Sequence, residues 1–299
     1  MYPPDAPVVL CADPVEYHGP HLSTRNDSLM SEGLARLLMA SFQHAGHDWP
    51  WRFAGQVGVG ADPVIGPGSE PVPYREVRRR VLAACRQVEA DGARRVLLCT
   101  FHGAPLHNLA LEAGARWLRA RGVRVFTPMN LLLRELMELE RGGIPEAFAA
   151  HGPTIAARLP YDVHAGFLET SLALRVAPET VHGHREVEPC PLLSPHPGPS
   201  RGARLAARLG LPGLATELDF MARGLAWYAL RPFPGYSGAP HLASAEAGQA
   251  LIDFMLPRMS AWALQAFLED RPAPAPVLTW LAPITLWGAI PRSSARVER

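Results

Sequence analysis

The chain of 299 residues lacks an excess of charge of either sign, because 29 lysines and arginines accompany 28 aspartates and glutamates. This balance excludes a bulk electrostatic attraction to nucleic acid or anionic lipid. The sequence also lacks an apolar run approaching about 18 residues, and so predicts no membrane-spanning helix. Its main basic cluster, Arg78, Arg79 and Arg80, is typical of the solvated face of an amphipathic helix. We therefore expect neither a nucleic-acid partner nor a membrane partner.

Cysteine is scarce, and no C-x-x-C pair occurs. Scattered cysteines in a chain of this length predict free thiols in a reducing compartment. Residues 2–5 are neither basic nor apolar, so that no secretory signal is expected and a cytoplasmic location is predicted. No G-x-G-x-x-G segment precedes a predicted helix, which leaves a dinucleotide site without support. The cysteines are Cys11, Cys85, Cys99 and Cys190.

Short apolar runs alternate with amphipathic segments along the chain. This alternation predicts an α/β fold, a single domain over 1–270 with a mostly parallel sheet and helices on both faces, followed by a Pro-rich tail over 271–299. Ligands of such folds bind at the carboxyl ends of the strands. The predicted strands are 6–13, 51–60, 94–103 and 123–130, and the predicted helices are 27–45, 74–92, 107–122, 131–150, one beginning near residue 165, 200–209 and 244–270.

The stretch VEYHGPHLSTRND, residues 15–27, concentrates potential metal ligands directly after the first predicted strand. Glu16 and His18 are two residues apart, and alternate side chains of an extended segment point the same way. A Gly-Pro turn signal between His18 and His21 would let Asp27 return to the same point. The alternative interpretation of Asp27 is the N-cap of the following helix.

A second strand predicts a further ligand at the same edge of the sheet. His102 stands at the end of the apolar run 94–103. Together with the residues above it would give two carboxylates and two imidazoles, a set that suits zinc, manganese or iron. Isolated histidines are more often surface or satisfied core residues. The convergence of four potential ligands at one edge favours a metal site.

The segment DVHAGFLETS, residues 162–171, carries His164 and Glu169. A helix beginning near Ala165 would place Glu169 about one turn in. The alternative interpretation makes both side chains ordinary polar residues of a helix N-terminus, where a carboxylate is favoured by the helix dipole.

Four motifs together resemble the creatininase family of metal-dependent amidohydrolases, which includes peptidase-like members linked to mycofactocin maturation. They are E-x-H-G-P-H-L followed by Asp27, a strand ending in H-G, H-A-G-x-x-E-T-S, and GYSGAPHLASAEAGQAL over 235–251. The matches occur in the right order and extend from residue 8 to about residue 255. The resemblance implies the family's fold, a divalent metal cofactor and a small-molecule amide substrate.

The resemblance also implies roles for individual residues. His164 would lie near the substrate and act catalytically, and His21 would support Glu16 or His18. The cofactor would be Zn²⁺, Mn²⁺ or Fe²⁺, with one or two ions per chain and Asp27 bridging them. The implied metal ligands are Glu16, His18, Asp27, His102 and Glu169.

The sequence departs from the family at two positions of the site. True creatinine hydrolases carry a glutamate where this chain has Ala104. The family motif H-A-G-E-x-E-T-S has an acidic residue where this chain has Phe167. Glu169 or His107 could replace the ligand lost at Ala104. Creatinine therefore becomes an unexpected substrate, and an amide more apolar near Phe101 and Phe167 is predicted.

The reaction that the resemblance implies is hydrolysis of a non-peptide or cyclic amide C–N bond. A metal lowers the pKa of its bound water from about 15.7 towards about 7, which gives hydroxide at neutral pH. That hydroxide would attack the carbonyl, and His164 would protonate the leaving nitrogen. Two alternatives remain open: a non-catalytic metal-binding or scaffold member of the family, and a peptidase-like maturation enzyme.

The resemblance further implies a homo-oligomer, because the family forms rings of several subunits. Large apolar side chains in the Pro-rich tail agree with this, since a monomer rarely exposes so many. The tail could instead fold back on its own domain. The side chains concerned are Leu278, Trp280, Leu281, Ile284, Leu286 and Trp287.

Overall fold

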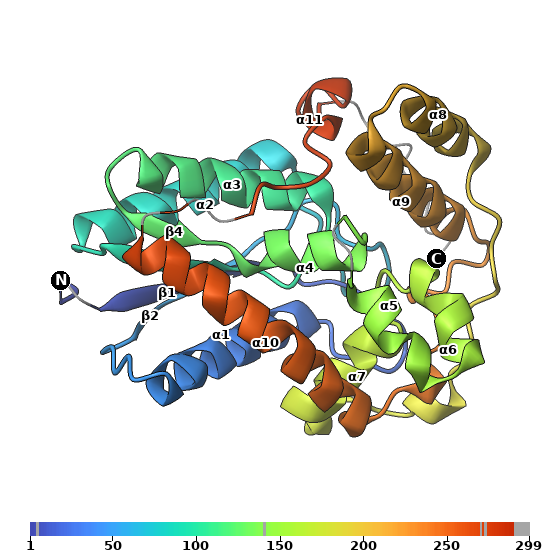
Figure 1. Cartoon of the computed structure of the whole chain (residues 1–299), viewed down its shortest axis with the longest axis horizontal. Helices are drawn as coiled ribbons and strands as arrows, with labels where there is room; N and C mark the ends of the chain where they lie inside the picture. Colours follow the sequence, from blue (N-terminus) through green and yellow to red (C-terminus); the bar gives the residue numbers. More distant parts are fainter. Residues whose placement is uncertain (4–5, 140–141, 270, 272–273, 290–299) are drawn as a thin grey trace. The chain divides into compact units, whose positions relative to one another are not determined.

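The computed structural model describes residues 1–3, 6–139, 142–269, 271 and 274–289 (Figure 1). The chain divides into two compact units. The first comprises Met1–Tyr17, Thr24–Leu131 and Met255–Arg299, and the second comprises His18–Ser23 and Leu132–Phe254. The domain bounds expected from the sequence, 1–270 and 271–299, remain a prediction.

The first unit contains a parallel sheet of four strands among the described residues, in the order β2-β1-β3-β4. β1 is fully buried between two neighbours, as its apolar sequence predicts. The α/β class with a parallel sheet is confirmed. The strands are β1 (Pro7–Asp13), β2 (Arg52–Gly58), β3 (Arg95–Cys99) and β4 (Arg124–Phe126).

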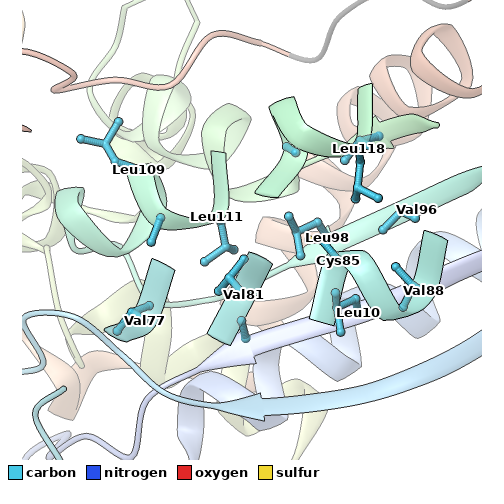
Figure 2. Packing of buried hydrophobic residues seen from close by; sticks show 14 of the residues in the cluster. Leu10, Val77, Val81, Cys85, Val88, Val96, Leu98, Leu109, Leu111 and Leu118 are labelled. Carbon is cyan, nitrogen blue, oxygen red and sulfur yellow. The ribbon is translucent and has the colours of Figure 1, made fainter. Parts of the chain in front are cut away.

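Helices cover both faces of this sheet, as predicted (Figure 1). α2 (Tyr74–Ala90) and α3 (Pro105–Arg119) pack together on one face, and α1 (Asn26–His44) lies on the other. Figure 2 shows the apolar side chains that join α2 and α3 to the strands. Gly114 allows the two helices to approach closely, because a Cβ there would lie 2.8 Å from the Cys85 sulfur.

The second unit is built from helices and turns. α7 (Phe167–Val176) carries Glu169 in its first turn, where it was predicted. The other helices are α5 (Ile144–Phe148), α6 (Pro153–Arg158), α8 (Pro197–Arg208) and α9 (Pro212–Tyr228), with short 3₁₀ turns at Ala149–His151, Leu159–Tyr161, Pro178–Thr180, His184–Glu186 and Pro240–Leu242. Two further helices contribute residues to both units, α4 (Pro128–Leu136) and α10 (Ala245–Leu268).

Two predicted strands end earlier than expected, the predicted helix 131–150 corresponds to two separate helices, α4 and α5, and one observed helix was not predicted. β4 ends at Phe126, because Pro128 starts α4 and suits the first turn of a helix. β3 ends at Cys99, so that His102 lies in the loop after the strand. α9 was not predicted, since most of its positions are half-exposed and do not form one clear apolar stripe.

The described part of the tail folds back on the first unit. α11 (Leu281–Ile284) contacts α3, and Ala282 is buried. The ring of Trp287 lies 6.3 Å from that of Tyr74. Ile284 nevertheless remains exposed. The predicted homo-oligomer remains a prediction. Within the described ranges, no helix has both the length and the apolar character needed to span a membrane.

Candidate functional site

Glu16 is held firmly in the loop that follows β1. Its backbone N–H donates to the carbonyl of Thr24 at 2.9 Å. Its Oε1 accepts the backbone N–H of Val64 at 2.5 Å, and the side chain is buried. One carboxylate oxygen is thereby fixed by the backbone, and the other, Oε2, lies 2.8 Å from Nδ1 of His102.

His102 lies in the loop between β3 and α3 and is buried. Its Nε2 lies 2.9 Å from the carbonyl oxygen of Ala61. A carbonyl only accepts, so Nε2 carries a proton in this contact. Nδ1 then faces two carboxylates, with Glu16 Oε2 at 2.8 Å and Asp27 Oδ2 at 3.6 Å. This orientation leaves Nδ1 as the nitrogen that can bind a metal.

Asp27 stands in the first turn of α1 and not at its N-cap. The helix begins at Asn26, the cap position is Arg25, and no side chain bonds there. The N-cap interpretation of Asp27 is therefore wrong. Its carboxylate is buried and faces His102. A carboxylate at this position is also stabilised by the positive end of the helix dipole.

The three side chains fit the demands of a divalent cation. One ligand atom from each of Glu16, Asp27 and His102 can be chosen so that all lie within 4.8 Å of one another, and all three residues are buried. Ligands bound to one zinc ion at about 2.0–2.2 Å lie roughly 3–4 Å apart. Two carboxylates and an imidazole form a donor set that suits zinc, manganese or iron.

We expect metal binding to this cluster to release a proton. Burial by itself lowers the pKa of His102, but the neighbouring carboxylates of Glu16 and Asp27 outweigh burial and raise the pKa to about 9. The ring is then charged at pH 7 in the metal-free protein, whereas only the neutral ring binds metal. Calorimetry in two buffers of different ionisation enthalpy would measure a release approaching one proton per chain at pH 7.

The same pKa gives a pH profile with a definite sign. Apparent metal affinity should rise with pH up to about 9, by at most about tenfold per unit for one proton. In the metal-free protein, the stabilising charge on His102 is fully present below pH 6.5 and is lost as pH rises to about 9. An affinity that does not change between pH 6.5 and 8.5 would contradict this assignment.

The second unit contains its own cluster of predicted site residues. Nε2 of His18, which is buried, lies 3.2 Å from Oε1 of Glu169. The ring of His164 lies 4.4 Å from the ring of His18. Burial tends to raise the pKa of Glu169, but His18, His164 and the N–H of Ala165 outweigh it and lower the pKa to about 2. Glu169 therefore remains ionised over the range in which the protein would work.

The backbone around His164 is fixed by Ser237. The Ser237 hydroxyl accepts the N–H of His164 at 3.0 Å, and the Ser237 N–H donates to the His164 carbonyl at 2.9 Å. The ring is half-buried and lies 5.7 Å from the ring of Trp227. The indole N–H of Trp227 in turn donates to the carbonyl of Tyr236 at 2.7 Å. The imidazole thus lies on a fixed backbone and remains partly accessible.

His21 contacts α7 and Tyr236 through its ring. Its Nε2 lies 3.0 Å from the hydroxyl of Thr170, and its ring meets Tyr236 edge-on at 5.8 Å. Burial lowers the pKa of His21 to about 4, which keeps the ring neutral at pH 7. Gly19, with φ of +68°, provides the predicted turn before it. The predicted role of His21 in supporting Glu16 or His18 remains a prediction.

The other three predicted residues have different surroundings. His107 is buried, with Nδ1 3.4 Å from the Ala61 N–H and Nε2 3.0 Å from the Ala12 carbonyl. Both nitrogens therefore contact the backbone, which favours a supporting role over metal ligation. Phe101 is half-exposed in the loop before His102. Phe167 is buried and its ring lies 6.5 Å from that of Phe148. Contact of Phe101 or Phe167 with substrate remains a prediction.

Sequence reasoning missed Asp13, Thr100 and Ser237. Asp13 ends the buried strand β1, and its pKa is raised by burial although four hydrogen bonds oppose that shift. A carboxylate at the carboxyl end of a buried strand is a signal in the sequence, but the predicted ligand set did not include it. Thr100 and Ser237 carried no such signal, because single hydroxyl residues in loops are common.

The chain passes between the units inside the stretch 15–27. Glu16 and Asp27 belong to the first unit, whereas His18 and His21 belong to the second. Each unit by itself therefore carries both a carboxylate and an imidazole from the predicted ligand set. The bridging role of Asp27 remains a prediction.

Several solved structures share the fold of this chain. No curated protein sequence matches the chain. A solved creatinine amidohydrolase (creatininase) is similar in fold, with a TM-score of 0.59 and 18% identity over 88% of this chain and 91% of its own. A structure described as a creatininase Mn form has a TM-score of 0.55 and 19% identity over 90% of this chain and 92% of its own.

A creatininase variant described as a Zn-Zn type also has a TM-score of 0.55 and 19% identity, over 90% of this chain and 92% of its own. At these identities the structures show a shared fold. The family profile described as creatininase, creatinine amidohydrolase, matches residues 4–262, which is most of the sequence. Its match includes every residue of both clusters, and the chain belongs to the creatininase family.

Proposed function

We propose that this protein is a metal-dependent amidohydrolase that cleaves a non-peptide or cyclic amide C–N bond. The observation that carries this proposal is the buried cluster of Glu16, Asp27 and His102, whose ligand atoms lie within 4.8 Å of one another. Buried ionisable groups are costly unless they are paired or bind a metal. The family to which the chain belongs supports hydrolysis of an amide.

Glu16, Asp27 and His102 would hold one cation in the first unit. Nδ1 of His102 would bind the metal, because Nε2 donates its proton to the Ala61 carbonyl at 2.9 Å. Oε2 of Glu16 lies 2.8 Å from Nδ1 of His102, while the backbone N–H of Val64 holds Oε1. Fixed ligands of this kind reduce the cost of ordering the site when the ion binds.

His18 and Glu169 would hold a second cation in the second unit, through Nε2 and Oε1, which lie 3.2 Å apart. Solved family members described as Mn and Zn-Zn forms make these two metals the first to test. A bound divalent cation supplies a Lewis acid and a hydroxide source at neutral pH.

His164 would donate the proton that the leaving nitrogen needs when the C–N bond breaks. Its ring is half-buried, and Ser237 holds its backbone on both sides. Histidine is the side chain whose ordinary pKa lies nearest neutral pH, which suits proton transfer there. The pair of His18 and Glu169 lies directly beside it.

Removal of metal provides the test of this proposal. Protein purified without chelator should contain at least one transition metal ion per chain by elemental analysis. It should release amine from a member of a panel of linear and cyclic amides that includes creatinine. Dialysis against a chelator should abolish this activity, and Zn²⁺ or Mn²⁺ should restore it. Protein with substoichiometric metal and no activity after metal addition would contradict the proposal and favour a non-catalytic family member.

A further inference from the structure

Asp13 ends β1 with a buried carboxylate that lies outside the predicted ligand set. Its Oδ1 accepts the hydroxyl of Thr100 at 2.9 Å and the backbone N–H of Phe101 at 2.8 Å. Its Oδ2 accepts the hydroxyl of Ser31 at 2.6 Å and the amide of Gln56 at 2.9 Å. One carboxylate therefore joins β1 to the loop after β3, to α1 and to β2, all within the first unit.

The contacts through Oδ1 lead to His102. The Thr100 hydroxyl donates its proton to Asp13, and its oxygen accepts the backbone N–H of His102 at 3.1 Å. The Thr100 oxygen also lies 3.1 Å from Nε2 of His107. Asp13 thus fixes the hydroxyl so that its lone pairs face the loop. The same carboxylate oxygen holds Phe101, the residue directly before His102.

The contacts through Oδ2 lead to Asp27. Ser31 stands four residues after Asp27 on α1, so that the two side chains lie on one face of the helix, one turn apart. The bond from Ser31 to Asp13 fixes this face of α1 against the end of β1. Glu16 follows Asp13 by three residues in the same segment. Asp13 therefore lies close in the chain to Glu16. Its hydrogen bonds hold Phe101, next to His102, and Ser31, one helical turn from Asp27.

We infer that Asp13 is the positioning residue of the Glu16–Asp27–His102 cluster, which sets the metal affinity of that cluster through Thr100 and Ser31. The inference rests on the proposed function, because it assigns Asp13 a role in holding the cation. Partners that orient metal ligands without touching the metal typically contribute about 10–100-fold to metal affinity or activity. Asp13 contributes by fixing the position of the loop that carries Thr100 and of the helix α1 that carries Ser31.

Substitutions at the two ends of the network test this without removing the buried carboxylate, whose loss could prevent folding. Thr100→Val keeps the size of the side chain and removes the hydroxyl, whereas Thr100→Ser keeps the hydroxyl. We expect Thr100→Val and Ser31→Ala each to weaken Zn²⁺ binding by about 10-fold or more, and Thr100→Ser to remain within about threefold of the wild type. The measurement is Zn²⁺ competition against a chromophoric chelator, with the absorption spectrum of the Co²⁺ form as a report on ligand geometry.

Asp13→Asn separates geometry from charge. The Asn oxygen can accept from Thr100 and Phe101, and its amide can donate to Ser31, whose hydroxyl also reaches the Ser28 carbonyl at 3.2 Å. The Gln56 amide, which donates to Oδ2 in the wild type, must turn so that its oxygen accepts from the Asn amide. If Asp13 acts by position, Asp13→Asn should bind Zn²⁺ within about threefold of the wild type. A loss at Asp13→Asn as large as that of Thr100→Val would overturn the positioning role in favour of a charge effect.

Ser41→Ala is the matched control. Ser41 lies on the same helix, and its hydroxyl is 2.6 Å from that of Ser260, far along α1 from Asp27. This variant should lower the Tm and leave Zn²⁺ affinity unchanged. If Ser31→Ala and Thr100→Val behave like Ser41→Ala, with a lower Tm and wild-type affinity, the inference is wrong and the proposed function is untouched. A wild-type protein that binds neither Zn²⁺ nor Mn²⁺ would instead overturn the proposed function, and the inference with it.

Discussion

Asp27→Asn should remove most of the bound metal and nearly all hydrolytic activity. The Asn side chain keeps the shape of Asp27, but its amide nitrogen is a donor and cannot bind a cation. It also removes one of the two negative charges that face Nδ1 of His102. The expected loss of metal affinity exceeds the roughly 10–100-fold that is typical of losing a partner that does not touch the metal. Elemental analysis and a chelator competition assay would measure it.

The control for this substitution is Glu32→Gln. Glu32 is a half-exposed acid on the same helix, so that the control makes the same exchange of acid for amide away from the cluster. Metal content and rate should both remain at wild-type values. Full metal content in Asp27→Asn would exclude Asp27 as a ligand. Helix capping could not explain a loss, because α1 begins before Asp27.

His164→Ala should lower kcat by about 10²–10⁴-fold, the usual contribution of a general acid, and leave metal content unchanged. Its ring is half-buried, whereas the neighbouring His18 is fully buried and lies 3.2 Å from Glu169. This difference in exposure favours His18 as the ligand and His164 as the group that meets substrate. The measurement is steady-state kinetics on the best amide of the panel, together with elemental analysis of the same sample.

His182→Ala provides the comparison, because His182 is an exposed histidine of the same unit outside both clusters. It should change neither kcat nor metal content. If His164→Ala loses metal in proportion to its rate, His164 is a ligand and the proposed division of roles between His164 and His18 is wrong. An unchanged kcat would remove His164 from the reaction altogether.

Local sequence patterns were sufficient for the class of fold. The apolar run at 6–13 predicts a buried strand, and the amphipathic pattern over 74–92 predicts a helix; β1 and α2 lie there. Each of these predictions uses only the spacing of apolar side chains within one segment, so it needs no knowledge of the segments that pack against it. Boundaries were less well predicted at β4 and α4, where Pro128 starts a helix inside the predicted strand.

The residue types of the site could also be predicted, because polar residues that follow buried strands of a parallel sheet gather at its carboxyl edge. Glu16, Asp27 and His102 were identified in this way, and the structure brings them together. Which residues support them could not be predicted. Glu16, for example, accepts the backbone N–H of Val64, which is 48 positions away, and such pairs leave no periodic trace in the sequence.

The sequence by itself determined the parallel α/β fold and the residue types of the candidate cluster, whereas the tertiary structure decided how each of these side chains is oriented. Nδ1 of His102 faces the carboxylates only because Nε2 meets the carbonyl of Ala61, 41 positions earlier. Asp13 connects β1 to the loop after β3 only because Thr100, 87 positions later in the chain, donates a hydrogen bond to it. Periodicity and propensity act over a few residues, but hydrogen bonds between distant segments exist only after the chain has folded.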